Sequence, residues 1–389
     1  MPPRYGADVI GGAETVMREM AHGLAERGWD VDVLTTCARD HFTWVNEYPP
    51  GVETVDGVTI RRFPAVISTP RAERAAISAA IVAEAPVPIE LQQRWMNDDV
   101  RVPDLFHFLL DHSSEYRAIV VAPYLFWPTF ACGQIAPDRT VLMPCLHDEP
   151  EAYLEIYQPV FSGARGIWFL SAPEQELAQR IHPQLAVHEV IGSGLHVPDR
   201  YDPEAFRERY GIEGRFVLFA GRREGGKNWE QLLDGFAAAS MYGDLDLKLV
   251  TMGALEVRPP AVIADKVVDL GFLPDDQRDN AFAAADAYLQ PSKYESFSRT
   301  IMEAWLAGTP VIANGASAVN RWHCERSGAG LLYDDDLELA QCLRFIAEAP
   351  DAAAALAVAG RQYVLDHYTW PAVLDQAEAT IFKWLPTGP

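Results

Sequence analysis

Two glutamates, Glu295 and Glu303, have seven residues between them; Glu295 lies in a polar loop and Glu303 inside the helix predicted to follow it. A carboxylate accepts hydrogen bonds from hydroxyl groups, so these side chains could hold a neutral polar ligand or a ribose diol. The segment 296–298 lies between the first glutamate and the predicted helix, where free backbone N–H groups suit a phosphate. The spacing alone is weak evidence, because a chain with 55 acidic residues contains such pairs by chance.

Around these residues the sequence predicts a strand, a loop, a helix and a second strand. An apolar run over 286–290 ends at Pro291. We expect Ser298 to cap a helix whose apolar residues recur at helical spacing until Gly308 ends it. The apolar segment 309–313 then fits a buried parallel strand. A helix that follows the carboxyl end of such a strand faces the crevice in which α/β sheets bind ligands.

A second candidate cluster is cationic. The strand expected over 215–220 is followed by Arg222, Arg223 and Lys227, just before a helix predicted from Asn228. Cations at a helix N-terminus are opposed by the helix dipole, by roughly several tenths of a kcal/mol each. A bound diphosphate would reverse this, because arginine donates to it in a forked geometry and lysine acts as a point charge.

The N-terminal region contributes a glycine pair and a histidine. Gly11 and Gly12 open a helix, where the missing side chains let a bulky ligand approach backbone N–H groups. His147, followed by Asp148, comes after a strand expected over 140–145, again at a carboxyl end. Both positions are compatible with ligand contacts.

The segment Glu-Ser-Phe-Ser at 295–298, followed by Met-Glu-Ala-Trp-Leu-Ala-Gly-Thr-Pro-Val at 302–311, resembles the Glu-x7-Glu signature of the retaining glycosyltransferases of family 4. That family has the GT-B fold, an α/β fold of two Rossmann-like domains with parallel sheets that face each other across a cleft. A C-terminal helix crosses back to the first domain. The resemblance covers nearly the whole chain; it is strongest over 215–333 and weaker over 65–135.

The domain boundary is expected near Ser193, where a strand ends in glycines and a proline-bearing link follows. The resemblance implies an N-terminal, acceptor-side domain over 1–193, completed by 370–389. It implies a C-terminal domain over 194–369 that binds the nucleotide-sugar donor.

The resemblance also implies a role for each candidate residue. Glu295 would contact the donor sugar and Glu303 the ribose, while Arg222 and Lys227 would hold the diphosphate. His147 would lie beside the sugar. The other donor-binding positions that it implies are Gly11, Gly12, Phe272, Leu273, Ser296, Phe297 and Ser298.

The activity that the resemblance implies is transfer of a hexosyl group, with retention, from a nucleotide diphosphate sugar to a hydroxyl of a small-molecule, glycan or lipid-linked acceptor. No cofactor is expected beyond the donor substrate. No metal is expected either, because no Asp-x-Asp is placed at the end of a strand to hold one beside the phosphates; residues 334–336 and 275–276 are interpreted as helix-entry or turn residues. Two alternatives stay open: a sugar-nucleotide epimerase on the same fold, and a sugar-nucleotide-binding subunit without turnover. A dinucleotide oxidoreductase is disfavoured, because no Gly-x-Gly-x-x-Gly follows a strand.

The composition limits the classes of partner that this protein is expected to bind. The net charge of −23 disfavours nucleic acid, whose phosphates would be repelled. No apolar run is long enough for a transmembrane span, and the start lacks the apolar region of a secretory signal. Five scattered cysteines without a Cys-x-x-Cys spacing predict reduced residues in a cytoplasmic protein.

The sequence departs from the family pattern at its start. A first β-strand normally precedes the glycine loop, whereas this sequence opens within the loop. That strand would lie in the middle of the N-terminal sheet, so we expect the strands over 31–36 and 118–122 to lack a partner. A late start site or a trimmed chain would explain the difference, and the activity of the chain as given stays open.

Overall fold

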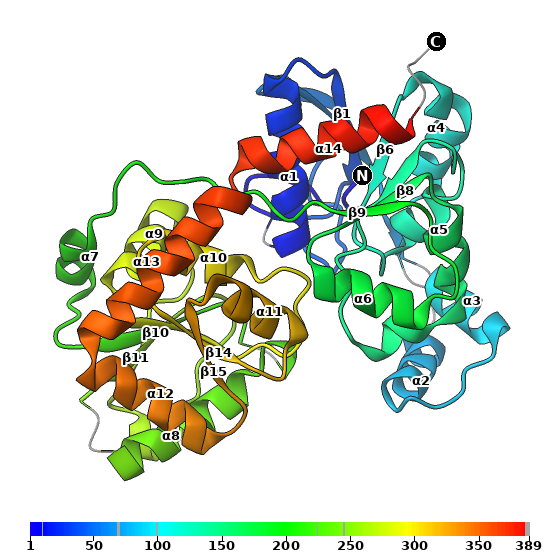
Figure 1. Cartoon of the computed structure of the whole chain (residues 1–389). Coiled ribbons are helices and arrows are strands. Elements are labelled where there is room, and N and C mark those ends of the chain that lie inside the picture. Colours follow the sequence, from blue (N-terminus) through cyan, green and yellow to red (C-terminus); the bar gives the residue numbers. More distant parts are fainter. Residues whose placement is uncertain (10, 68–70, 99, 224, 244–245, 386–389) are drawn as a thin grey trace. The chain divides into compact units, whose positions relative to one another are not determined.

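The computed structural model describes residues 1–9, 11–67, 71–98, 100–223, 225–243 and 246–385 (Figure 1). Its internal contacts divide the chain into two compact units. Unit 1 consists of Met1–Gly194 together with the segment from Trp370 onward, and unit 2 is Leu195–Thr369.

Unit 2 is built on a parallel sheet. In the described part of this unit, six strands pair in the order β12-β11-β10-β13-β14-β15. The strands are β10 (Phe216–Ala220), β11 (Lys248–Met252), β12 (Val267–Asp269), β13 (Ala287–Gln290), β14 (Val311–Asn314) and β15 (Gly330–Tyr333). Every residue of β10, β13 and β14 is buried, as continuous apolar runs in a covered parallel sheet require. The order is that of a doubly wound fold, and it reverses between β10 and β13.

Helices cover this sheet. They are α7 (Pro203–Tyr210), η5 (Gly225–Lys227), α8 (Trp229–Gly243), η6 (Ala261–Ile263), α9 (Asp275–Ala284), α10 (Arg299–Leu306), α11 (Ala318–Ser327), α12 (Asp336–Glu348) and α13 (Pro350–His367). Phe219 of β10 packs on Trp229 of α8, with ring centroids 4.8 Å apart. Gly360 lets α13 approach α10, because a Cβ there would lie 2.4 Å from the Trp305 ring.

The start of α10 differs from the sequence prediction. Ser298 precedes the helix, but its φ of 63° and ψ of 60° are left-handed, and its side chain makes no capping bond. Its Oγ instead accepts a hydrogen bond of 2.7 Å from Nε2 of Gln290. Ser298 is therefore the residue before the helix, as predicted, but its side chain does not cap the helix and instead ties the loop back to the end of β13.

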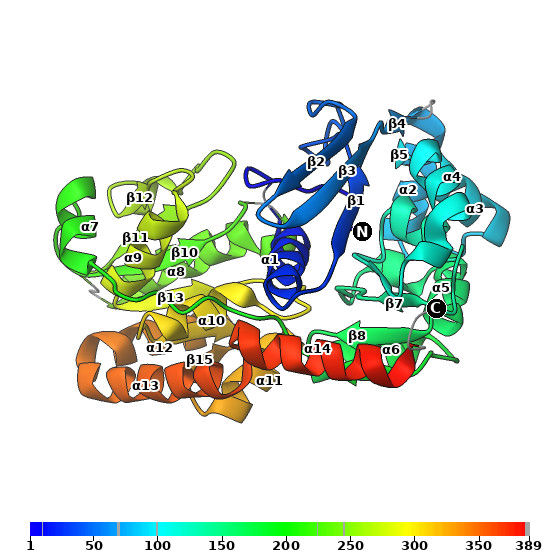
Figure 2. The same ribbon diagram turned by 90° about the horizontal axis from the view of Figure 1, so that it is seen from above.

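Unit 1 contains several sheets. In its described part, β1 (Val31–Thr36), β3 (Val58–Phe63) and β2 (Gly51–Val55) form one sheet, in which β1 and β3 are parallel (Figure 2). A second, parallel sheet has the order β6-β7-β8-β9. Its strands are β6 (Ile119–Val121), β7 (Thr140–Leu142), β8 (Gly166–Phe169) and β9 (His188–Val190). The short strands β4 (Val66–Ile67) and β5 (Val100–Arg101) pair separately.

The helices of unit 1 include the last helix of the chain. They are α1 (Gly12–Glu26), α2 (Arg71–Val82), α3 (Ile89–Asn97), α4 (Pro103–His112), α5 (Gln158–Gly163), α6 (Ala172–Ile181), α14 (Trp370–Trp384) and the short η1 (Ser113–Glu115), η2 (Pro128–Cys132), η3 (Pro150–Tyr153) and η4 (Glu155–Tyr157). Helix α14, red in Figure 1, lies beside α1. Its Leu374 packs on Gly23 and its Trp384 on Gly166, where an added Cβ would lie 2.6 and 2.2 Å from those side chains.

The first residues lie between the two larger sheets of unit 1. The amino group of Met1 donates to the carbonyl of Val120 at 2.6 Å, and the N–H of Ala122 donates to the carbonyl of Met1 at 3.4 Å. On the other side, the hydroxyl of Thr36 donates to the carbonyl of Pro3 at 2.7 Å. Burial lowers the pKa of the Met1 amino group to about 5. Residues 1–3 thus bridge β1 and β6, the two strands that we expected to lack a partner.

Candidate functional site

The predicted donor residues gather at the carboxyl edge of the unit 2 sheet. Arg222 and Lys227 follow β10, Glu295 follows β13, and Glu303 lies on α10. Strands β10 and β13 are parallel neighbours, and the strand order reverses between them. In open α/β sheets, ligands bind outside the carboxyl ends of the strands at this reversal. Two loops that are distant in sequence therefore meet at the position where such a sheet binds ligands.

An ion pair joins these two loops. Nζ of Lys227 lies 2.7 Å from Oε1 of Glu295. The lysine side chain is 31% exposed and the glutamate side chain 10%. Lys227 ends the short helix η5, so its backbone is fixed just before α8 begins. The structure thus brings together two residues that the sequence predicted separately, and it leaves the cation partly open to solvent.

Arg223 differs from the expectation of a cation that faces a ligand. It is 7% exposed and donates to the carbonyls of Gly253 and Leu255, to the hydroxyl of Thr251 and to Asp269. Burial lowers the pKa of Arg223, and the charge of Asp269 opposes that effect. The prediction is therefore wrong for Arg223, which holds the ends of β11 and β12. Arg222 remains half-buried in the loop after β10.

The loop of Ser296–Ser298 is anchored by its central side chain. Phe297 is buried and packs edge-on against His323 and Tyr368, at centroid distances of 5.1 and 4.9 Å. Behind it, Nδ1 of His323 lies 3.0 Å from the hydroxyl of Tyr363. Burial lowers the pKa of His323 to about 3, so this imidazole is neutral at ordinary pH. The loop backbone therefore rests on a packed, uncharged base.

Glu303 has two oxygens in different environments. Its side chain is 11% exposed, and Oε1 accepts from Nη2 of Arg278 at 3.3 Å. Oε2 is buried and has no hydrogen-bond partner among the described residues. A carboxylate oxygen in that state could accept a hydroxyl group of a ligand.

The loops after β10, β11 and β12 are packed closely together. The N–H of Gly253 donates to the carbonyl of Gly271 at 2.7 Å. A Cβ at Gly253 would lie only 2.0 Å from the carbonyl oxygen of Gly221, so this crossing requires glycine. Phe272 follows on the same edge with 63% of its surface exposed, whereas Leu273 is buried. The ring of Phe272 is thus a flat apolar surface at the carboxyl end of β12.

In unit 1, the glycine pair lies over a buried ion pair. Gly11 is the residue before α1, and Glu14 in the first turn pairs with Arg4. Both charged side chains are almost fully buried. A Cβ at Gly11 would lie 2.1 Å from Oε2 of Glu14, whereas nothing lies within 4 Å of a Cβ at Gly12. The sequence prediction missed Glu14, although an acid in the first turn of a helix is a recognised signal.

His147 is oriented by a neighbour that the sequence did not suggest. Its Nδ1 lies 3.8 Å from Oε2 of Glu149, whose other oxygen, Oε1, accepts a hydrogen bond of 2.7 Å from the hydroxyl of Tyr124. Burial acts to raise the pKa of Glu149, but the nearby His147 and the hydrogen bond from Tyr124 outweigh this effect, so the pKa is lowered. Asp148 instead pairs with Arg180 at 2.8 Å on the surface. Glu149 is therefore the carboxylate that faces His147.

A buried glutamate supports the same loop. Glu174 of α6 accepts the N–H groups of Leu146 at 2.6 Å and Leu170 at 2.5 Å. These residues follow β7 and β8, so one carboxylate joins the ends of two strands. Burial raises the pKa of Glu174 to about 8, although the backbone hydrogen bonds act in the opposite direction.

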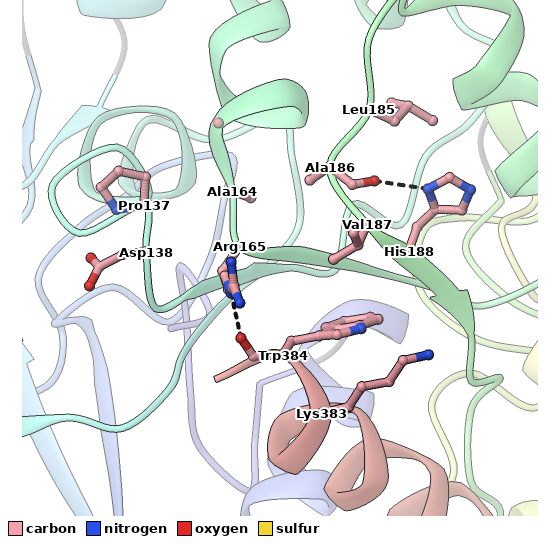
Figure 3. A pocket seen from close by; sticks show the side chains of 11 residues that line it. Pro137, Asp138, Ala164, Arg165, Leu185, Ala186, Val187, His188, Lys383 and Trp384 are labelled. Atoms are coloured by element: carbon pink, nitrogen blue, oxygen red, sulfur yellow. Dashed lines mark hydrogen bonds between the residues drawn. The ribbon is translucent and has the colours of Figure 1, made fainter. Parts of the chain in front are cut away.

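A cavity of about 880 Å³ lies elsewhere in unit 1. It is lined by the loops that precede β7, β8 and β9 and by the end of α14 (Figure 3). Arg165 donates there to the carbonyl of Trp384, and Nδ1 of His188 lies 2.9 Å from the carbonyl of Ala186. This is the amino edge of the sheet, opposite to the edge at which such sheets bind ligands. None of the predicted site residues lines it.

The described residues contain neither a metal-binding cluster nor a membrane-spanning helix. In the part of the chain that the structure describes, no group of three or more His, Cys, Asp or Glu side chains is arranged to hold a metal ion. Among the same residues, no helix combines the length and the apolar character needed to cross a bilayer.

Comparison with known families finds a match within unit 2. Residues 214–348 match the family described as glycosyl transferases group 1. The chain as a whole is similar to sucrose-phosphate synthase from Thermosynechococcus elongatus, with a TM-score of 0.72, 18% identity and coverage of 97% of this chain and 96% of that one. It is also similar to HepE from Anabaena in complex with UDP and glucose, with a TM-score of 0.69, 18% identity and coverage of 98% and 100%. The protein thus has the two-domain GT-B fold, and its residues 214–348 are similar to glycosyl transferases group 1.

Relatives of known activity are distant. The 2-deoxystreptamine glucosyltransferase of Streptomyces kanamyceticus is 29% identical in an alignment 196 positions long that covers 44% of this chain and 50% of the relative. The mannosylfructose-phosphate synthase of Agrobacterium fabrum is 30% identical in an alignment 141 positions long that covers 30% of this chain and 31% of the relative. The D-inositol 3-phosphate glycosyltransferase 1 of Catenulispora acidiphila is 24% identical in an alignment 401 positions long that covers 95% of this chain and 90% of the relative. The chain therefore spans half or less of the first two relatives.

Proposed function

We propose that this protein is a retaining glycosyltransferase of family 4 that uses a nucleotide diphosphate sugar and an acceptor hydroxyl. The observation that carries the proposal is the meeting of Lys227 and Glu295 at the reversal of strand order in unit 2. The match of residues 214–348 to glycosyl transferases group 1 supports it. So do the complexes of the structurally similar HepE with UDP and with UDP-glucose.

The chemistry follows from where charge develops. The bond between the sugar's anomeric carbon and the diphosphate oxygen breaks, and the oxygen leaves with the electron pair. The acceptor oxygen attacks the same face, and its proton passes to the departing phosphate. Lys227, Arg222 and the backbone amides of Ser296–Ser298 would stabilise the leaving diphosphate without a metal ion. Glycosidases differ, because they need two placed carboxylates as acid and nucleophile.

The other predicted residues have roles consistent with their surroundings. Glu295 would contact the donor sugar once the diphosphate draws Lys227 away, and Glu303 would bind the ribose. Phe272 and Leu273 would border the base, where the exposed ring of Phe272 offers a stacking surface. His147 and the Gly11–Gly12 pair would serve the sugar and the acceptor. The five unpaired cysteines favour a reducing, cytoplasmic location.

The test is a screen of common nucleotide sugars, including UDP-glucose and GDP-mannose, with and without sugar acceptors. Release of nucleoside diphosphate and a labelled glycoside product support the proposal. Lys227→Met should lower turnover about 10²–10³-fold through lost charge stabilisation, whereas Lys227→Arg should retain more activity. Lys248→Met is the control, because Lys248 begins β11 at the opposite edge of the same sheet.

Three outcomes would overturn the proposal. Turnover close to that of the wild type in Lys227→Met would remove this residue from the site. Conversion of the donor into a second sugar nucleotide would indicate an epimerase. Nucleotide binding without any product would indicate a binding subunit.

A further inference from the structure

We propose that Arg278 is a positioning residue, which holds the Glu303 carboxylate so that its second oxygen faces the ribose of the donor nucleotide. The inference rests on the proposed function, because it takes Glu303 as the ribose-binding residue. Arg278 lies outside the motif from which that role was predicted.

The geometry separates the two oxygens of Glu303. Arg278 lies on α9 and Glu303 on the neighbouring helix α10. Nη2 of Arg278 donates to Oε1 at 3.3 Å, while Oε2 is buried without a hydrogen-bond partner among the described residues. The Glu303 side chain is 11% exposed, so water has little access to it.

A buried carboxylate oxygen without a partner is uncommon in native proteins and calls for an explanation. A ligand hydroxyl would provide the missing donor, and a ribose carries two adjacent hydroxyl groups. A guanidinium can only donate, so Arg278 takes up one oxygen and leaves the other as an acceptor. Because Oε1 is held, rotation of the carboxylate is restricted and Oε2 keeps its direction.

The charges around Arg278 explain why a cation is needed at this position. Nη1 of Arg278 lies 3.8 Å from Oδ1 of Asp275, but that aspartate is 82% exposed and solvent screens the contact. Asp279 follows Arg278 on the same helix. Burial raises the pKa of Asp279 to about 6; Arg278 lowers this pKa, whereas Glu303 and Asp275 raise it further. The charge of Arg278 therefore offsets the repulsion between Asp279 and Glu303, which would be uncompensated in its absence.

The test compares ribonucleotides with deoxynucleotides. UDP and GDP are titrated by calorimetry, and the tighter ligand is then compared with its 2′-deoxy and 3′-deoxy forms. The wild type should prefer the ribonucleotide about tenfold or more, since a buried charged acceptor loses a donor in the deoxy forms. In Arg278→Leu this preference should fall to about twofold or less, because ribonucleotide binding weakens and deoxynucleotide binding changes little. Arg278→Lys should restore most of the preference.

Arg258→Leu is the matched control. Arg258 pairs with Glu256 through side chains that are 82% and 69% exposed, and its removal should leave the preference unchanged. A ribose preference in Arg278→Leu equal to that of the wild type would overturn this inference alone, because wild-type nucleotide binding would still support the proposed function. Absence of binding of both UDP and GDP to the wild type would overturn both. If Arg278→Leu does not fold, the preference in Arg278→Lys and Arg278→Gln decides, and equal preferences in these two variants contradict the inference.

Discussion

Two adjacent arginines, Arg222 and Arg223, should respond to the same substitution in opposite ways. Arg223 is buried and donates to two carbonyls, a hydroxyl and Asp269, so its replacement by leucine leaves these acceptors without a donor. Removal of one partner of a buried ion pair costs about 3–5 kcal/mol. The Asp269 side chain is 36% exposed and can regain some water, so we expect a value near the lower limit.

The expected change can be measured as a shift in urea unfolding. With a loss of about 3 kcal/mol and a slope of about 2 kcal/mol per M urea, the midpoint for unit 2 should fall by about 1.5 M in Arg223→Leu. Arg222→Leu should change stability by less than about 1 kcal/mol but should reduce turnover about 10²–10³-fold. Hydrogen exchange of peptides that cover β10, β11 and β12 reports on unit 2 separately from unit 1.

Arg223→Lys serves as a further control, because it keeps the charge but loses the forked donors. It should unfold at an intermediate urea concentration. A midpoint for Arg223→Leu within about 0.3 M of the wild type, at the slope assumed here, would refute the assignment of Arg223 to the support of β11 and β12. A larger loss of stability in Arg222→Leu than in Arg223→Leu would refute the contrast itself.

Three other results are expected. Gly11→Ala should destabilise unit 1 by about 1–3 kcal/mol, because its methyl group meets the Glu14 carboxylate. Gly12→Ala should keep the melting temperature of the wild type but lower turnover. If the two variants had the same melting temperature and the same turnover, this expectation would be contradicted. Burial lowers the pKa of His323 from 6.5 to about 3, so its stability contribution is present above pH 6.5 and lost as the pH falls toward 3. His323→Phe should remove up to roughly 5 kcal/mol of that pH dependence, and a pH profile of stability unchanged by the substitution would argue against it. Turnover should persist in EDTA, and a loss that magnesium or manganese restores would show that a metal ion takes part.

The strands and helices of unit 2 were largely predictable, because burial on both faces produces a readable pattern. The run over 215–220 is apolar after Arg215, and β10 spans Phe216–Ala220. The central helix, α10, ends at Leu306, two residues before Gly308 with its φ of 78°. Such elements are encoded by neighbouring residues, so sequence reasoning finds them.

The direction of individual side chains was not predictable in the same way. Arg223 turns inward because Asp269, which lies far along the chain, provides a partner. Glu149, rather than Asp148, faces His147 because the bend after β7 and the hydroxyl of Tyr124 place it there. Ser298 was expected to cap α10, but the nearby Gln290 offered a competing donor. In each case the deciding partner becomes visible only when the strands are assembled.

The return of the chain to unit 1 in α14 has a consequence for biosynthesis. Seven residues of α14 are buried: Trp370, Val373, Leu374, Ala377, Thr380, Ile381 and Trp384. The surface of unit 1 on which these residues pack includes Gly23 and Gly166, and it is translated long before the helix that covers it. The ribosome must first complete Leu195–Thr369, which at about 5–20 residues per second takes roughly 10–35 s.

At the end of that interval unit 2 is complete and can fold, whereas unit 1 still lacks α14 and has an uncovered apolar surface. Unit 2 begins and ends at neighbouring residues, since Leu195 forms a bridge with Thr369, so its folding brings the two connections together. The first residue of α14, Trp370, then follows directly after Thr369, next to the end of the first segment of unit 1 at Gly194. Unit 1 can therefore finish folding only after α14 has been synthesised. Until then its apolar surface stays exposed, where chaperones can bind it or incorrect contacts can form.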